Sequence, residues 1–480
     1  MDDIKIGLDF GTHQTKICIQ RTPDEGHGIP EYEFFKFTGN NGEEQFFLPS
    51  VIQINKDDTL SYGYVDPELE KDSLPLPQLE KITSVDASHI DDEAQNLFAK
   101  YSVNADASEE SMNTLIELLK CKYKIDDQAC RIRTTEAQQK YDMEMAEYNK
   151  ARNLFRYFKQ ATFAEYPWEK AIDPKLLCIW YLAYILFLLE DIFPDGFAIN
   201  MGVPTDDKTF NQKRELGTQL LISAIHLVED VYVRDLRRFL NEKVESLMKN
   251  TVIPDFNEDD KEFYRIDIFP EAYASLIGLT SRGKLSEGMS LNADIGGGTT
   301  DISFFIVKDR IPKIYKYWSI PLGLNYIAEK SGFDYSEKDF VKNANPDVIA
   351  KFNRKKEDVV YLLVDNLSSI VTSRGIFKSH LLNALRDRIL VYNGGGSSYP
   401  EISNSIYLFT DVKVADAELW SEEIIKDKKK VSKLFNLLTT AYGLSVSEND
   451  SEVILCDFDT IISNKNNSNS ERNEIDKDVC

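Results

Sequence analysis

Short runs of alternating hydrophobic and polar residues predict β-strands near the N-terminus and again in the second half of the chain. Residues 4–8 read Ile-Lys-Ile-Gly-Leu, which has the two-residue period of a strand, and residues 17–19 read Ile-Cys-Ile after an intervening turn. Apolar runs at 34–35 and 51–54 predict a second strand pair. Further strands are expected at 197–204, on both sides of Asp294 and at 389–392.

Apolar residues at three- and four-residue spacing predict helices between these strands. Residues 176–189 are almost wholly apolar, but the run is shorter than the roughly 20 residues that cross a bilayer, and Lys175 and Glu190 close it. We therefore expect a buried helix there. Strands that alternate with helices indicate an α/β protein. The other helical patterns cover 134–160, 208–249, 353–374 with a continuation to Arg388, and 427–442.

The composition is that of a globular protein with room for more than one folding unit. The 480 residues are 42% hydrophobic and 28% charged, and this length suggests about two to four folding units. The formal net charge of -24 argues against nucleic acid as the main partner, because an acidic surface repels phosphate backbones. A locally positive nucleotide site remains compatible with this charge.

The six cysteines predict neither disulfides nor a metal site. No two of them form a Cys-x-x-Cys pair. Residues 1–5 lack the basic start and apolar core of a signal peptide. We therefore expect reduced thiols and a cytoplasmic protein. Residues 448–480 are polar and are expected to form a disordered tail.

Three glycine-containing turns, each directly after an expected strand, carry the candidate chemistry. Residues 9–16 read Asp-Phe-Gly-Thr-His-Gln-Thr-Lys, residues 294–301 read Asp-Ile-Gly-Gly-Gly-Thr-Thr-Asp, and residues 393–400 read Asn-Gly-Gly-Gly-Ser-Ser-Tyr-Pro. Glycine lets backbone N–H groups close around phosphate oxygens, because no Cβ blocks the approach. Strand-end carboxylates can hold Mg²⁺ through water, and a lysine adds positive charge. One such turn alone can be a structural hairpin, but the three together predict a site for nucleotide phosphates.

These turns resemble the phosphate-one, phosphate-two and adenosine motifs of the actin-like ATPase superfamily. Residues 294–301 are very similar to the phosphate-two motif of DnaK-type (heat-shock protein 70 family) chaperones and of the cell-division protein FtsA. The resemblance implies an α/β, two-lobed, ribonuclease H-like fold with Mg²⁺ and ATP in a cleft between the lobes. Similar patches between the motifs lie at 48–52, 200–204, 269–274 and 441–443.

The resemblance also implies a role for each motif residue. Asp9 and Asp294 would organise Mg²⁺ and its waters, and Glu271 would orient the water that attacks ATP. Lys16 and Asp301 would complete the catalytic set. The phosphates would be held by Gly11, Thr12, Thr15, Lys16, Gly296, Gly297, Gly298, Thr299 and Thr300, and the adenosine would face Gly394, Gly395, Gly396 and Ser397.

The resemblance implies a first lobe at 1–204, with a helical insertion at about 66–170, and a second lobe at 205–447 whose last helix returns to the first lobe. The chain departs from the chaperone pattern in two respects. Chaperones carry a lysine just after the second strand pair, whereas residues 63–67 contain none and Lys16 follows the actin pattern. After the last helix we also expect no β-rich peptide-binding domain, because residues 448–480 are short and polar.

The leading hypothesis is an ATP-hydrolysing, chaperone-like switch whose lobe closure controls a partner protein. The partner surface is expected at 134–160, unless that helical segment packs on its own domain, or at 229–260. The alternatives are an actin-like filament and a catalytically silent nucleotide-binding scaffold. A membrane scaffold fits less well because the C-terminal region is polar and acidic, and no acceptor site for a small-molecule kinase is recognisable.

Overall fold

The computed structural model describes residues 3–66, 137–144, 154–373, 390–403, 412–414 and 425–447, apart from short gaps inside these ranges. The chain divides into two compact units. One consists of Met1–Ser73, Arg152–Glu329 and Phe333–Cys480, and the other of Leu74–Ala151 with Lys330–Gly332. The elements that form the candidate site all belong to the first unit. The predicted continuation of a helix to Arg388 and the predicted tail from residue 448 lie outside the described residues.

The first sheet has the strand order β11-β10-β1-β2-β3, and β6 (Leu48–Pro49) pairs with β2. Its strands β1 and β2 are antiparallel neighbours, as are β2 and β3, whereas β1, β10 and β11 run parallel. The strands predicted at 4–8, 17–19 and 197–204 are thereby confirmed. Their bounds are β1 (Asp3–Phe10), β2 (Gln14–Thr22), β3 (Glu31–Phe34), β10 (Ala198–Val203) and β11 (Ile266–Pro270).

The second sheet has the strand order β14-β13-β12-β15-β16. Strands β12, β13 and β14 are successive antiparallel neighbours, and β12, β15 and β16 run parallel. Order and direction therefore repeat those of the first sheet, strand for strand, although the sequence contains no recognisable repeat. The bounds are β12 (Gly288–Ile295), β13 (Thr300–Lys308), β14 (Ile311–Ile320), β15 (Leu390–Asn393) and β16 (Val412–Val414).

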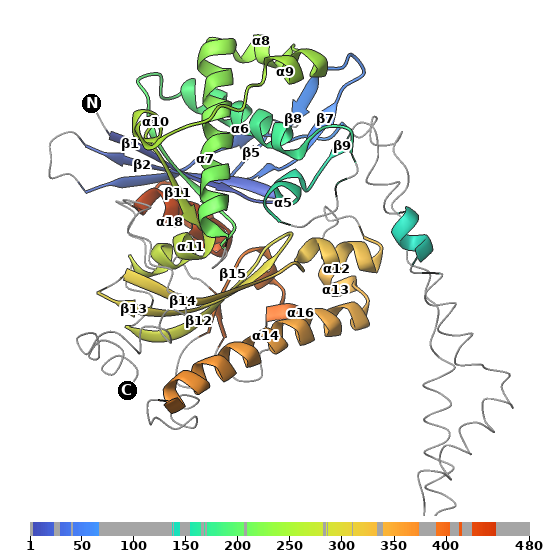
Figure 1. The fold of residues 1–480 in the computed structure, drawn as a ribbon, viewed down its shortest axis with the longest axis vertical. Coiled ribbons are helices and arrows are strands. Elements are labelled where there is room, and N and C mark those ends of the chain that lie inside the picture. The colour runs from blue at the N-terminus through green and yellow to red at the C-terminus, as the bar shows by residue number, and fades with distance from the viewer. Residues whose placement is uncertain are drawn as a thin grey trace, which may run out of the picture. The chain divides into compact units, whose positions relative to one another are not determined.

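Two helices lie between the sheets, and each packs on the sheet that it does not follow in the chain (Figure 1). Helix α11 (Glu271–Thr280) follows β11 and packs on β13 and β14, while α18 (Phe435–Val446) follows the second sheet and packs on β1 and β2. The two helices touch through small residues. A Cβ added at Gly443 would lie 1.7 Å from the carbonyl oxygen of Ala274, so only glycine permits this approach.

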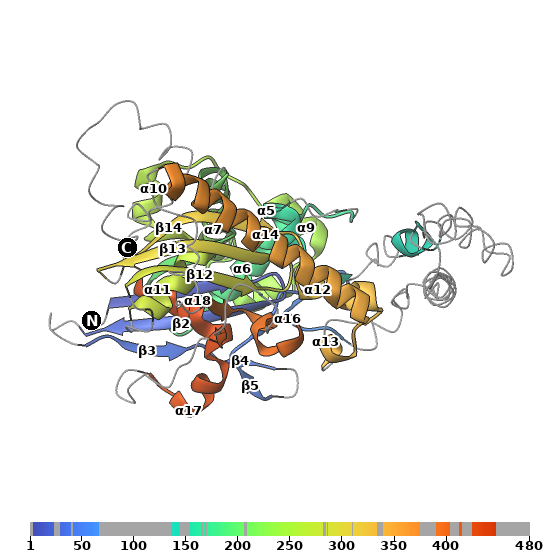
Figure 2. The same cartoon turned by 90° about the horizontal axis from the view of Figure 1, so that it is seen from below.

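The outer faces of the two sheets are covered by different helices (Figures 1 and 2). Helix α6 (Pro174–Glu190) is buried along most of its length in the core of the first sheet, which confirms the prediction of a buried helix at 176–189. No described helix is both long and apolar enough to cross a membrane. The other covering helices are α7 (Phe210–His226) beside the first sheet and α12 (Leu324–Ser331), α14 (Pro346–Ser373), α13 (Phe340–Asn343) and α16 (Pro400–Ser403) beside the second.

Three segments that were each predicted as one helix are divided into several elements in the structure. The segment predicted at 134–160 is interrupted by β9 (Leu154–Phe155), because these residues pair with β7 (Ile52–Ile54), and only then does α5 (Phe158–Phe163) begin. The segment predicted at 208–249 divides into α7, a π-helical turn (Leu227–Val231), α8 (Leu236–Leu240) and α9 (Val244–Asn250). The segment at 427–442 divides into α17 (Lys428–Val431), a 3-10 turn and α18.

Several short elements complete the described structure. They are β4 (Phe37–Thr38), β5 (Glu44–Gln45), β8 (Leu60–Tyr62), α10 (Glu258–Phe263) and a 3-10 turn at Gly395–Ser398. Strand β8 pairs with β7, so the predicted strand at 51–54 belongs to a small separate sheet rather than to the first sheet.

Candidate functional site

Polar side chains lie at the carboxyl ends of the parallel strands in both sheets. Asp9 lies at this end of β1, Glu271 directly follows β11, Asp294 lies near the end of β12 and Asn393 ends β15. This edge of an α/β sheet is where such folds bind ligands, because the loops that leave parallel strands converge there. The strand directions thus explain why residues far apart in the sequence meet.

A cavity of about 100 Å³ lies where these ends meet. Most of the predicted site residues line it: Asp9, Gly11, Thr12, Lys16, Glu271, Asp294, Gly296, Gly297, Gly298, Thr299, Asp301, Gly394 and Gly395. Four predicted residues are outside the lining: Thr15, Thr300, Gly396 and Ser397. His13, Gln14, Lys159, Asn436, Leu437 and Thr440 also line the cavity, although none of them was predicted as a site residue.

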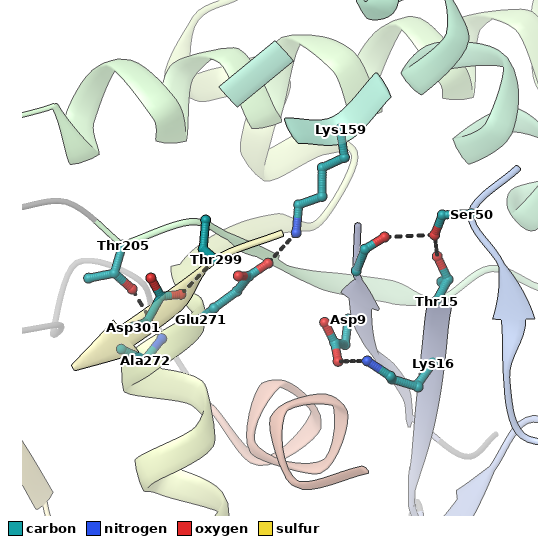
Figure 3. A network of polar contacts seen from close by, with 11 residues as sticks. Asp9, Thr15, Lys16, Ser50, Lys159, Thr205, Glu271, Ala272, Thr299 and Asp301 are labelled. Atoms are coloured by element: carbon teal, nitrogen blue, oxygen red, sulfur yellow. Dashed lines mark hydrogen bonds and ion pairs between the residues drawn. The ribbon is translucent and has the colours of Figure 1, made fainter. Parts of the chain in front are cut away.

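In the first turn, a carboxylate and a lysine neutralise each other. Asp9 and Lys16 are register partners across β1 and β2, and the Lys16 Nζ lies 3.0 Å from Asp9 Oδ2 (Figure 3). The Ser50 hydroxyl donates to the Gly11 carbonyl oxygen at 2.6 Å and thereby holds the turn. Thr15 has its hydroxyl 3.4 Å from that of Ser50 and is fully buried. Thr15 therefore supports the turn from behind instead of facing the cavity.

The second turn places two carboxylates where the first has a carboxylate and a lysine. Asp294 and Asp301 are register partners across β12 and β13. Asp301 accepts a hydrogen bond from the Thr299 hydroxyl at 3.3 Å (Figure 3). It accepts a second one from the Ser319 hydroxyl at 2.6 Å. The Thr300 hydroxyl donates to the Leu322 carbonyl oxygen at 2.8 Å, so it points away from the cavity.

These two carboxyl groups are poorly stabilised as anions. Burial, followed by the charges of Asp301, Asp9 and Glu271, raises the pKa of Asp294 to about 8, and Lys16 only partly opposes this. Burial also raises the pKa of Asp301 to about 6, although the hydrogen bond from Ser319 works in the opposite direction. A cation that entered the cavity would favour both ionised forms, so the site has the electrostatic character of a cation site.

Helix α5 supplies a lysine that the sequence analysis missed. The side chain of Lys159 is only 3% exposed, and its Nζ donates to Glu271 Oε1 (Figure 3). The Nζ also lies 5.5 Å from the centre of the Phe10 ring. The cavity therefore contains two lysines, although the stretch after the second strand pair has none. No spacing pattern in the sequence indicates Lys159, because the packing of α5 beside the two turns, and not a motif, brings it to the cavity.

The two turns approach each other closely, and α5 bridges them. A Cβ added at Gly297 would lie 1.5 Å from Cδ2 of His13, so the second turn has glycine where the first turn presses against it. Gln160 follows Lys159 on α5. Its side-chain amide N–H donates to the Gly298 carbonyl oxygen at 3.3 Å, and its amide oxygen accepts from the Asn325 side chain at 3.3 Å. The ring of His13 packs edge-on against Tyr157, with 5.2 Å between the ring centres.

The third turn closes the cavity beside Asp294. Gly394 adopts a left-handed φ of 75°, and a Cβ there would lie 2.3 Å from Asp294 Oδ1, so this position requires glycine on both counts. Asn436, at the start of α18, donates to the hydroxyls of Ser397 and Ser398 at 2.7 and 3.1 Å. Ser397 thus shapes the turn from outside the cavity, and Asn436 reaches the lining in its place.

Backbone contacts fix the start of α11. The N–H of Ala272 donates to the Thr205 hydroxyl at 3.0 Å (Figure 3), which holds Glu271 at the junction of β11 and α11.

Comparison with models of known protein families gave no match, and a search of curated proteins found no significantly similar chain. The site must therefore be interpreted from its own geometry.

Proposed function

We propose that this chain is a Mg²⁺-dependent, ATP-hydrolysing molecular switch with a two-lobed, actin-like fold. The observation that carries the proposal is the meeting of three glycine turns, three acidic strand ends and two lysines in one cavity between two sheets of identical strand order. Glycine N–H groups and lysines suit phosphate oxygens, and the carboxylates suit a cation that accompanies the phosphates.

Asp9 and Asp294 are the residues that would hold Mg²⁺ through water. In the described part of the chain, no three His, Cys, Asp or Glu side chains are grouped as a complete metal site. This fits Mg²⁺, which keeps several waters and takes its remaining ligands from one or two carboxylates and the substrate phosphates. The raised pKa of Asp294 fits the same role, because the ion would stabilise the anion that burial disfavours.

Glu271 is the candidate for orienting the attacking water. Its carboxylate faces the cavity while Lys159 holds it from the side of α5. Lys159 fixes the direction of the Glu271 carboxylate through their ion pair, and its charge also favours phosphate nearby. Lys16, Gly296, Gly297 and the Thr299 hydroxyl would bind the phosphates. Gly394 and Gly395 would lie against the adenosine.

The size of the cavity supports a switch. Small-molecule sites usually enclose about 300–1,000 Å³, which is more than the about 100 Å³ found here. The contact of His13 with Gly297 and the bridge from Gln160 to Gly298 narrow the space. Nucleotide entry would have to separate the two sheets. Such a hinge motion is the kind of change that a partner protein can sense.

The test is release of phosphate from ATP with Mg²⁺ by the wild type, Glu271→Ala and Lys159→Met. General-base and charge effects of this kind contribute about 100- to 10,000-fold, so we expect turnover to fall by at least about 100-fold in both variants while ATP binding persists. Exposed Glu245, on α9, provides the control Glu245→Ala, which should match the wild type. A wild-type protein that binds no ATP, by calorimetry with Mg²⁺, would refute the proposal.

A further inference from the structure

The segment between β10 and β11 forms a surface with two hollows on the flank of the first sheet. The first hollow, of about 260 Å³, has an apolar floor that includes Leu186, Ile199 and Ile225. The second, of about 220 Å³, lies between α7 and the chain before α10. Tyr264 lines both hollows and therefore forms the wall between them. None of the residues that line the candidate nucleotide cavity belongs to either hollow.

Apolar side chains at the edges of these hollows are exposed to an unusual degree. Phe263 lines the first hollow with 78% of its surface exposed, and Val252 lines the second with 52% exposed. Next to it, Ile253 is 39% exposed. The Phe263 ring stands edge-on to Tyr264, with 5.0 Å between the ring centres. The pair thus forms an aromatic ridge between two pits, and aromatic anchors of this kind dominate protein interfaces.

Residues with unusual backbone conformations lie at and beside the first hollow. Val233, Arg234 and Arg265 all have left-handed φ values, of 51°, 59° and 53°, which are costly for residues with a Cβ and are retained at functional positions more often than elsewhere. The preceding π-helical turn is a second irregular feature that recurs at functional sites. Arg234 bridges Glu190 at 3.2 Å and Glu229 at 3.4 Å, which fixes the wall. A preformed hollow needs little ordering when a ligand binds.

The side of this surface formed by Asp255 and α10, here called the rim, is acidic. Asp255 lines the second hollow, and Glu258, Asp259 and Glu262 are exposed on α10, the helix that ends in Phe263. The basic residues nearby are paired with acids: Arg234 with Glu190 and Glu229, Arg265 with Asp3, and Lys261 with Asp267 at 3.8 Å. Nucleic acid and anionic lipid would be repelled by this rim, whereas lysine and arginine would be attracted.

We propose that this surface docks a basic segment of a partner protein, with two apolar side chains that fill the hollows on either side of the Phe263–Tyr264 ridge. The apolar pits provide the affinity, and the acidic rim selects lysine- and arginine-rich sequences. The surface lies away from the nucleotide cavity, so docking needs neither ATP nor Glu271. The proposal is therefore independent of the proposed ATPase activity.

The experiment uses a displayed library of random 12-residue peptides, selected on the full-length wild-type chain without nucleotide. We expect the selected peptides to be enriched in Lys and Arg and to share two apolar positions. Their affinity, measured by fluorescence anisotropy, should fall at least tenfold in Phe263→Ala and in the double variant Glu258→Lys/Asp259→Lys. It should stay unchanged in Ile311→Ala, which removes an apolar side chain that is 46% exposed on β14.

Three outcomes would overturn the proposal. The first is selection of acidic or neutral peptides, or of none at all. The second is equal binding by the wild type and Phe263→Ala, with thermal unfolding curves that confirm both are folded. The third is concentration-dependent self-association that Phe263→Ala abolishes, because a second copy of the chain would then be the occupant. Binding of the selected peptides by Glu271→Ala with wild-type affinity keeps this test separate from that of the ATPase.

Discussion

The two sheets share one strand order, yet the first turn contains a neutral ion pair where the second contains two carboxyl groups. Asp9 faces Lys16 across β1 and β2, whereas Asp294 faces Asp301 at the corresponding place across β12 and β13. The first turn is neutral by itself because its pair is joined at 3.0 Å. The second turn has no lysine of its own, and burial raises the pKa of both its carboxyl groups.

Matching architecture therefore does not imply matching chemistry. One half of the cavity contains its own counter-charge, whereas the other half has two carboxyl groups whose ionised forms an added cation would stabilise. A phosphate group and a metal ion need these two environments side by side. The asymmetry also agrees with the position of α5, which brings Lys159 to Glu271 and only the neutral amide of Gln160 to the second turn.

The largest effect is expected from Lys16→Asp, which gives the first turn the two carboxyl groups that the second turn has. Loss of one cation and gain of one anion beside the phosphates should weaken ATP binding by roughly 100- to 1,000-fold, or about 3–4 kcal/mol. Isothermal titration calorimetry measures this directly. The control Lys175→Asp makes the same charge change at the exposed start of α6, and equal weakening there would show that only net charge matters.

A pH-dependent effect is expected from Asp294→Asn, which removes one of the two carboxyl groups in the second turn. A carboxyl group whose pKa is higher in the folded than in the unfolded state binds more protons when folded, so its contribution to stability falls as pH rises. For Asp294 this loss spans the interval from its ordinary pKa of 3.8 to about 8.

The stability advantage of Asp294→Asn over the wild type should therefore grow between about pH 4 and pH 8, at up to about 1.4 kcal/mol per pH unit. Urea denaturation in the presence of a chelator measures it, and subtracting wild type from variant removes the contributions of other groups. Exposed Asp309→Asn serves as the control. An advantage that shrinks with rising pH would contradict the assignment.

The smallest effect concerns the contact between the turns. Gly297→Ala should lower stability by about 1 kcal/mol, because the new methyl group meets the His13 ring, whose side chain can shift in part. Gly296→Ala is the matched control, since its nearest neighbour is the Thr299 carbonyl oxygen at 3.3 Å. The double variant His13→Ala/Gly297→Ala should recover most of the loss in thermal unfolding. If the double variant is no more stable than Gly297→Ala, the loss of stability does not come from a clash with the His13 ring.

Much of the local structure could be predicted because its determinants are local. The alternating residues of β1 and the apolar run of α6 form the expected elements, and Val348, Phe352 and Val359 are buried on one face of α14 at helical spacing. The prediction was wrong at 154–155. These residues have helical spacing in the sequence, but in the structure they form a strand that pairs with β7. Strand pairing depends on a distant partner, which no local pattern reveals.

The three turns were visible in the sequence, because each follows a strand pattern with a polar residue and glycine, and glycine permits tight turns wherever they lie. Only the tertiary structure decided which side chains complete the site. Lys159 and Asn436 reach the cavity because α5 and α18 pack against it. The hydroxyls of Thr15, Thr300 and Ser397 are instead engaged with Ser50 and with the carbonyl oxygens of Leu322 and Gly394. The physical reason is that motif spacing follows the chain, whereas charge pairing and burial depend on neighbours in space.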